Sequence, residues 1–134
     1  MFNGSRKVVS VVISDPTADA RIPILVAPSD HSITVEKLSA ALTSTLSGST
    51  VNYVDLSLEN GGTAGTAQTS IMSSIGGTAG WVANTIQSGA VTAGSGRLTA
   101  AQVLVLDYAE TGTVAPGYLT VTVEYTDGLG AARN

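Results

Sequence analysis

The chain has 134 residues, one His, no Cys and a formal net charge of −4. Its length predicts a single domain, residues 1–134, and the lack of Cys excludes disulfides and thiolate metal sites. Its six Lys and Arg residues are scattered, without the basic patch of a nucleic-acid binder. Gly, Ser and Thr form about a third of the chain, and together with many β-branched residues they favour an all-β fold with Gly/Ser/Thr-rich loops.

Turn signals recur about every 8–15 residues, a spacing typical of a β-sandwich or barrel. About eight strands are predicted, at residues 7–13, 22–26, 32–40, 51–59, 67–75, 81–87, 102–108 and 118–125. Pro23 cannot donate to a β-ladder, so the second of these strands is expected at a sheet edge. Residues 103–106 are apolar on both faces, which predicts a central position for the seventh strand.

Residues 35–46 fit two structures. Helical spacing is present in Val35, Leu38, Leu42 and Leu46. A strand with one bulge would instead align Ile33 and Val35 with Leu38, Ala40 and Leu42. We favour the strand for the first half, because the segments on both sides are predicted to be β.

The motif Gly-Gly-Thr-Ala-Gly occurs at residues 61–65 and again at residues 76–80. Two copies are too few for a stacked repeat, which needs three or more units. We therefore predict two similar turns, in which glycine supplies the positive φ angles.

No motif in the sequence specifies a reaction. None of the glycine clusters is followed by the Lys of a phosphate-binding loop. His31 is the only possible base for a serine hydrolase, and no nucleophile elbow accompanies it. The sequence therefore predicts no enzyme, no cofactor and no small-molecule substrate.

Carboxylates form the best remaining candidate site. Asp15 and Asp19 share one loop, and Asp107 and Glu110 share one strand end. Carboxylate and carbonyl oxygens are the ligands of calcium, so these four residues are weak calcium candidates. A glycosidase with paired carboxylates is a further alternative, and solvated turn carboxylates are the interpretation we adopt.

The N-terminal segment imitates a signal peptide, but its apolar run ends at Asp15-Pro16 and is too short. No stretch approaches the ~20 apolar residues of a membrane helix, so we expect neither a signal peptide nor a membrane partner. Residues 1–7 are expected to form an N-terminal arm, with Asn3, Arg6 and Lys7 as candidate interface residues. Trp81, the single Trp, is either a core residue or an interface anchor, with a slight preference for the core.

Two parts of the sequence resemble small β-sandwich proteins on the heads of tailed bacteriophages. The first joins ITVEKL at residues 33–38 to NYVDLSLEN at residues 52–60. The second joins LTAAQVLVL at residues 98–106, ETGTV at residues 110–114 and PGYLTVTVEY at residues 116–125.

This resemblance implies a jelly-roll-like sandwich that acts as a capsid decoration, or cement, protein on the outer surface of the virion. It implies the major capsid protein as partner, and a homotrimer at quasi-threefold positions between capsid subunits. It carries over no catalytic residue. The alternatives are a tail, baseplate or pilus-like assembly subunit and a carbohydrate-binding module.

Overall fold

The computed structural model describes residues 6–127, and the structural statements below refer to these residues. The chain is all-β, with ten strands and one short 3-10 helix, η1 (Gly77–Ala79). The strands are β1 (Arg6–Ile13), β2 (Ala20–Val26), β3 (Ile33–Leu42), β4 (Tyr53–Asn60), β5 (Thr69–Ser70), β6 (Ile75–Gly76), β7 (Gln87–Ala90), β8 (Arg97–Leu98), β9 (Val103–Thr111) and β10 (Leu119–Asp127).

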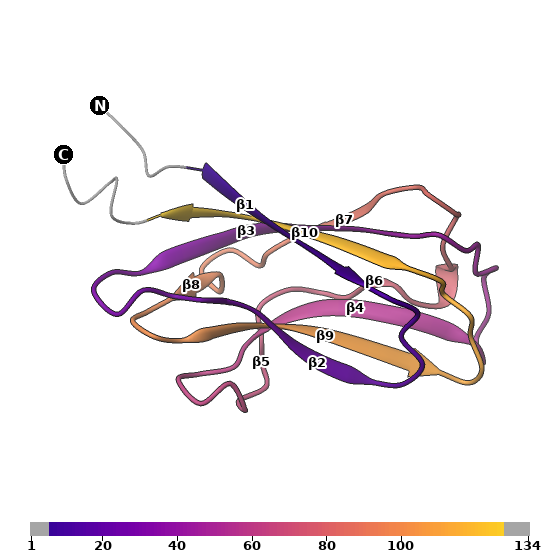
Figure 1. The fold of residues 1–134 in the computed structure, drawn as a ribbon, viewed down its shortest axis with the longest axis horizontal. Helices are drawn as coiled ribbons and strands as arrows, with labels where there is room; N and C mark the ends of the chain where they lie inside the picture. The colour runs from indigo at the N-terminus through magenta and orange to yellow at the C-terminus, as the bar shows by residue number, and fades with distance from the viewer. Residues whose placement is uncertain (1–5, 128–134) are drawn as a thin grey trace.

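Two antiparallel sheets lie face to face as the two layers of a sandwich (Figure 1). Sheet A has the order β1-β10-β3-β7, with β8 also paired to β3. Sheet B has the order β2-β9-β4-β5, with β6 also paired to β4. The predicted all-β sandwich is therefore confirmed, with two strands more than expected.

The core lies between the sheets and is built by period-2 alternation. In β4, Val54, Leu56 and Leu58 are buried, whereas Asp55 and Ser57 face away from the core. The facing strand β10 alternates in the same way and buries its residues Leu119, Val121 and Val123. Both inward faces agree with the pattern in the sequence.

The two predicted strand positions are also confirmed. β2 pairs only with β9, so the strand that contains Pro23 lies at the edge of sheet B. A register shift between Pro23 and Leu25 makes Ile24 an extra, bulged residue in this edge. β9 lies between β2 and β4, as its apolar sequence predicted.

The ambiguous segment is a strand as far as Leu42. β3 pairs with β10 along its whole length, and the register shifts so that Glu36 has no opposite residue. This bulge keeps Val35 and Leu38 both on the core side. The helical alternative fails because the ladder with β10 and burial on one face of a sheet outweigh local helix propensity.

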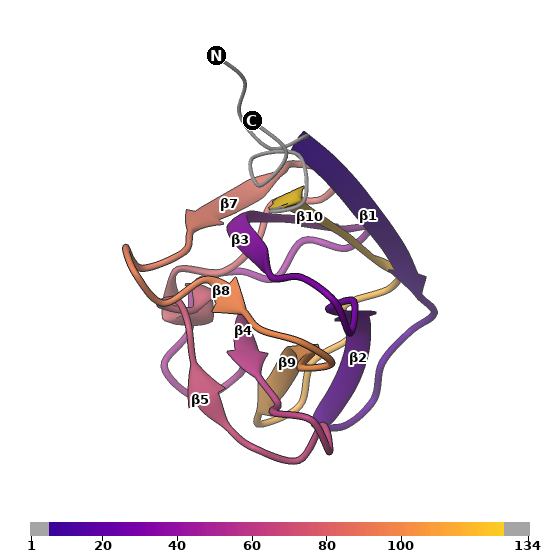
Figure 2. The same cartoon turned by 90° about the vertical axis from the view of Figure 1, so that its left-hand side faces the viewer.

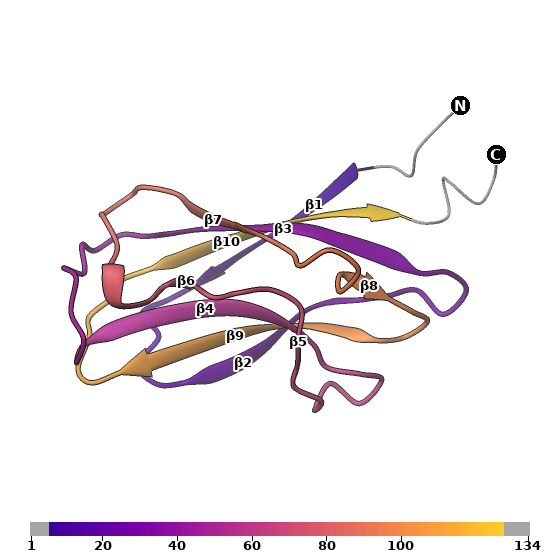
Figure 3. The same cartoon turned by 180° about the vertical axis from the view of Figure 1, so that it is seen from behind.

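Two predicted strands are wrong. The segment 67–75 contains only the short β5 and the first residue of β6. The segment 81–87 is a turn region in which Asn84 has a φ of 57°, and only Gln87 belongs to a strand. Left-handed Asn84 and the turn hydrogen bond from Thr85 N to Val82 O interrupt the extended chain there. Figure 3 shows this side of the sandwich, along which β5, β6 and η1 run.

Candidate functional site

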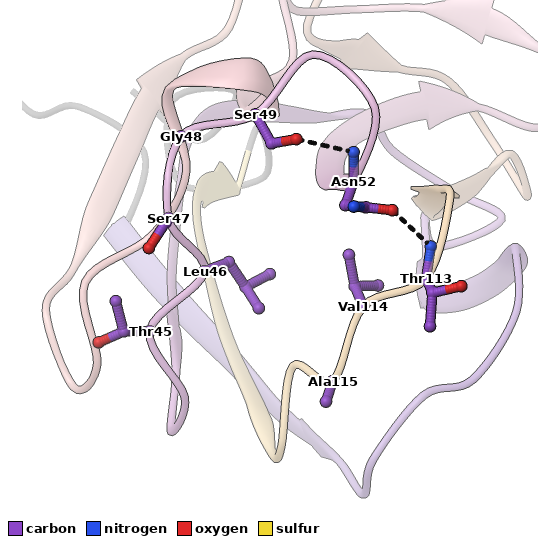
Figure 4. A pocket seen from close by; sticks show the side chains of 9 residues that line it. All are labelled: Thr45, Leu46, Ser47, Gly48, Ser49, Asn52, Thr113, Val114 and Ala115. Atoms are coloured by element: carbon purple, nitrogen blue, oxygen red, sulfur yellow. Dashed lines mark hydrogen bonds between the residues drawn. The ribbon is translucent and has the colours of Figure 1, made fainter.

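A cleft of about 340 Å³ lies at one end of the sandwich, between the loop after β3 and the loop after β9 (Figure 4). Leu46 forms one wall, and Val114 and Ala115 form the other. Asn52 joins the two loops, because its Oδ1 accepts a hydrogen bond of 2.9 Å from Thr113 N. Ser49 Oγ accepts from the backbone of Asn52 at 3.0 Å and fixes the first loop.

The chemistry of this cleft is limited to neutral hydrogen bonding. The side chains that line it are hydroxyl, amide or aliphatic, and none is a carboxylate, an imidazole or a cation. General acid–base and nucleophilic catalysis need a titratable group close to the nucleophile. The geometry therefore offers a contact surface at this end of the molecule.

The structure brings two of the four calcium candidates into direct contact. Asp19 Oδ1 accepts a hydrogen bond of 2.8 Å from Glu110 N, which joins two of the candidate residues. Glu110 Oε1 also accepts from the Tyr108 hydroxyl at 2.6 Å, and Asp15 is exposed in a turn with a φ of 40°. Within residues 6–127, no group of three His, Asp or Glu side chains could hold a metal ion.

A charged cluster lies on the outer face of sheet B, the face that points away from the core. Arg21 Nε donates to Glu59 Oε1 at 2.9 Å, and its two terminal nitrogens donate to the carbonyls of Gly65 and Ala67. Asp107 lies directly opposite Arg21 in the ladder between β2 and β9. This cluster holds the loop after β4 against the sheet.

Electrostatics in this cluster disfavours a further negative charge. Burial raises the pKa of Asp107 above its ordinary value of 3.8, and the carboxylate of Glu59 raises it further, against the opposing effect of Arg21. Burial also raises the pKa of Asp55 on the same face. Burial, followed by the hydrogen bond to Glu110, raises the pKa of the core residue Tyr108.

The interface candidates have different positions. Arg6 and Lys7, expected in an arm, are the first two residues of β1, and Arg6 forms an ion pair of 3.1 Å with Glu124. Asn3 lies outside the described residues. Trp81 is only 2% exposed and donates through Nε1 to the Val54 carbonyl at 3.1 Å, so of its two interpretations the core position is the one observed.

The outer face of sheet A carries small hydroxyl side chains together with charged ones, among them Lys37 and Glu124, which lie opposite each other in the ladder. One row across four strands consists of Ser10, Thr122, Ser39 and Ser88. Two hydrogen bonds of 3.0 Å join neighbours in this row, one between Ser10 and Thr122 and one between Ser39 and Ser88. One hydrogen bond joins the two hydroxyls of each pair, and both hydrogen bonds stay intact when another protein covers this face.

The sequence did not single out Arg21 and Glu59, or the contacts of His31. Arg21 and Glu59 lie 38 residues apart in different strands, so their pairing depends on strand order. His31 lies between two carboxylates, with Nδ1 2.7 Å from Asp30 and Nε2 2.9 Å from Asp127. A doubly protonated imidazole can donate to both, and it fastens the loop before β3 to the end of β10.

Comparison with known proteins gives a likeness of fold. No protein-family model matches the chain, and no curated protein matches it. The chain is similar to a chain of the cyanophage Pam1 capsid asymmetric unit, with a TM-score of 0.56 and 14% identity, over 94% of this chain and 87% of that one. A chain of the Bacillus endospore appendages, a family of disulfide-linked pili, has a TM-score of 0.44 and 13% identity, over 94% and 90%. A chain from the infectious bursal disease virus Gt strain has a TM-score of 0.35 and 10% identity, over 91% and 36%.

The first of these likenesses covers nearly all of both chains and defines the class of fold. This protein has the fold of that chain, a β-sandwich of two antiparallel sheets. None of the helices within residues 6–127 is long and apolar enough to cross a membrane.

Proposed function

We propose that this protein is a non-enzymatic structural protein of a virion, and specifically a decoration or cement protein that binds the outer surface of the major capsid shell and stabilises it. The observation that carries this proposal is the fold likeness to a chain of the Pam1 capsid asymmetric unit over 94% of this chain. The resemblance of residues 33–60 and 98–125 to phage head proteins points the same way.

The surface of the molecule supports a role in protein contact. The outer face of sheet A presents Ser and Thr side chains whose hydroxyls are already paired, so its desolvation costs little. A shallow hollow in this face, lined in part by Ala41, Ile86 and Thr120, adds apolar contact area. We assign this face to the contact with the capsid shell.

The finer parts of the proposal come from the resemblance. We propose one functional domain over residues 1–134, a homotrimer at quasi-threefold positions on the outer capsid surface, and contact with the shell through residues 1–7. Arg6 and Lys7 suit an acidic capsid surface, because opposite charges favour encounter and orientation.

The test adds purified protein to capsids that lack it and measures bound protein and the temperature of capsid disruption. We expect saturable binding and a higher disruption temperature. Ser39→Arg, on the outer face of sheet A, should weaken binding at least tenfold, because a buried unpaired cation is costly. Its matched control is Ser57→Arg, on the outer face of sheet B, which should leave binding unchanged.

Failure to bind at any concentration would rule out the decoration role. Equal effects of the two arginine variants would contradict the assignment of the face. Removal of residues 1–5, which leaves β1 intact, tests that part of the arm separately, and unchanged capsid occupancy would show that residues 1–5 make no contact.

A further inference from the structure

One side of the sandwich is closed, and the other side is formed by two sheet edges. On the closed side, the Gln87 side chain accepts from Gly76 N at 3.0 Å and donates to the Gly80 carbonyl at 2.7 Å, which ties β7 to the η1 segment. On the other side, β1 ends sheet A and β2 ends sheet B (Figure 2). The contact surfaces available for extending a sheet are therefore the edges of β1 and β2.

The edge of β2 is protected against pairing. Pro23 removes one backbone donor, and the bulge at Ile24 disturbs the spacing of the others. Arg21 in the same strand is engaged with the loop after β4. Natural proteins use such devices to keep an edge strand from pairing with another chain.

The edge of β1 has none of these devices. Its eight residues contain no Pro, and they pair with β10 in one unbroken register from Arg6 to Ile13. Within residues 6–127, β10 is its only strand partner. Its second row of backbone donors and acceptors is therefore available along the full strand.

The sequence of β1 is symmetric about Ser10. Val9 and Val11 flank it on the core side of the strand, and Val8 and Val12 flank it on the outer side. Two such strands, paired antiparallel about a two-fold axis at Ser10, place Val8 opposite Val12 of the partner subunit. The same register places Val9 opposite Val11 of the partner subunit.

This pairing covers exposed apolar surface. Val8 is 58% exposed and Val12 is 65% exposed, and both lie on the outer face of the strand with Ser10 between them. Directly opposed side chains on one face of an antiparallel pair lie close enough to contact each other, so valines in these positions bury apolar surface together. The two-fold arrangement makes two such outer pairs and two inner ones.

Charge selects the antiparallel direction. Lys7 lies at the start of β1, and Asp15 lies just beyond its end. In the Ser10-centred register, Lys7 lies opposite Ile13 of the partner subunit, so Lys7 and Asp15 of the partner subunit lie at the same end of the paired strands. A parallel pair would instead place the two Lys7 side chains, and the two Arg6 side chains, next to each other.

We propose that the edge of β1 binds the β1 strand of a second copy of this chain, antiparallel and centred on Ser10, so that sheet A continues through both copies. Such a contact is isologous, because each copy supplies the same strand. It goes beyond the capsid-binding function.

Light scattering over a range of protein concentrations tests the pairing with two double variants. V8K/V12K places Lys opposite Lys in both outer pairs, whereas V8K/V12E places Lys opposite Glu. We expect the average mass of the wild type to approach twice that of V8K/V12K at the same concentration, and V8K/V12E to regain the wild-type mass. The control V51K/V82K adds two cations at valines of similar exposure, 65% and 63%, outside the strands, and should keep the wild-type mass.

Hydrogen exchange of the β1 amides, compared between wild type and V8K/V12K, gives a second readout that reports the strand itself. We expect slower exchange in the wild type at high concentration.

Equal masses for wild type and V8K/V12K would overturn the pairing. A folded V8K/V12E that stays as small as V8K/V12K would overturn the Ser10 register. A mass three times that of one chain, unchanged in every variant, would also overturn the β1 pairing and would support the homotrimer. Protection of β1 only after capsids are added would assign the edge to another protein, and loss of capsid binding alone would affect only the proposed function.

Discussion

The two copies of Gly-Gly-Thr-Ala-Gly have the same sequence and different environments. In both copies the glycines at the second and fifth positions of the motif have positive φ, 69° and 76° in residues 61–65 and 68° and 84° in residues 76–80. The first glycine differs, because only Gly76 has a positive φ, of 83°. The copies therefore share part of their local conformation, as two similar turns should.

What surrounds the copies is different. The first copy lies over the outer face of sheet B, where it covers Val105, and Arg21 holds it in place. The second copy encloses Trp81, and its last glycine lies against the Leu46 carbonyl. A locally determined turn can thus serve either as a cover on a sheet or as part of the closed side of the core, and long-range contacts decide which.

The largest expected effect is at the second copy. Trp81→Ala removes the largest buried side chain and its hydrogen bond to Val54, so it should lower the free energy of unfolding by about 3–5 kcal/mol. Denaturant unfolding measures this. Val82→Ala, at the exposed next residue, is the control and should change stability by less than about 0.5 kcal/mol. Equal effects at both positions would contradict the core role of Trp81.

The next test compares the last glycine of each copy, Gly65 and Gly80. Gly65→Ala meets only Val103, at 3.9 Å, so its cost is that of a positive φ, about 1–2 kcal/mol. Gly80 has φ 84° and ψ −170°, a conformation essentially restricted to glycine, and Gly80→Ala also drives a Cβ into the Leu46 carbonyl, so it should cost about 3 kcal/mol or more. Thermal unfolding separates the two variants, and similar costs would mean that the second copy can shift without loss.

A smaller effect is expected for the cover over sheet B. Arg21→Met removes three hydrogen bonds and leaves Glu59, 8% exposed, near Asp107 without its cation. The loss should be about 1–3 kcal/mol, below that of a fully buried pair, because the Arg21 side chain is 27% exposed. Hydrogen exchange should show faster opening of residues 61–67. Arg6→Met, which breaks the exposed pair with Glu124, should cost less than about 1 kcal/mol, and the same loss in both variants would contradict a special role for Arg21.

The smallest effect is a dependence on pH. Because the pKa of Asp107 is raised in the folded state, the folded chain binds its proton more tightly than the unfolded chain. The contribution of this group is therefore most favourable below its ordinary pKa of 3.8 and declines as the pH rises through the raised value. Asp107→Asn should stabilise the protein at pH 7 by less than about 1 kcal/mol, since solvent screens a half-buried group, and should have no such effect near pH 3. A lower unfolding midpoint for the variant at pH 7 would contradict this sign.

Much of the fold could be predicted from the alternation of apolar and polar residues and from the position of Pro23. The alternating residues of β4 and β10 predicted which faces are buried, and Pro23 predicted an edge. The segment 67–87 could not be predicted, because buried Ile71 and Met72 are consecutive and show no period. In this segment the chain passes from sheet B to sheet A, and its side chains are buried because the segment lies along the side of the core.

Less of the candidate site could be predicted. Alternation places Asp55, Ser57 and Glu59 on the outer face of β4, but Glu59 is buried there because the 61–65 turn folds back over the sheet. Arg6 and Lys7 were correctly seen as exposed, but they belong to a strand. Trp81 had two possible roles, and only the position of Val54 across the core decided between them.

The sequence by itself determined the class of structure: an all-β sandwich, with glycine turns and inward faces set by period-2 burial, and without clustered reactive side chains. Those features follow from short-range sterics and from the alternation of apolar and polar residues, which any strand of the same pattern would share. The tertiary structure decided which strands pair, which copy of the glycine turn covers a sheet, and which edge stays free. These depend on contacts between residues tens of positions apart, and such contacts form only when the two sheets close over one core.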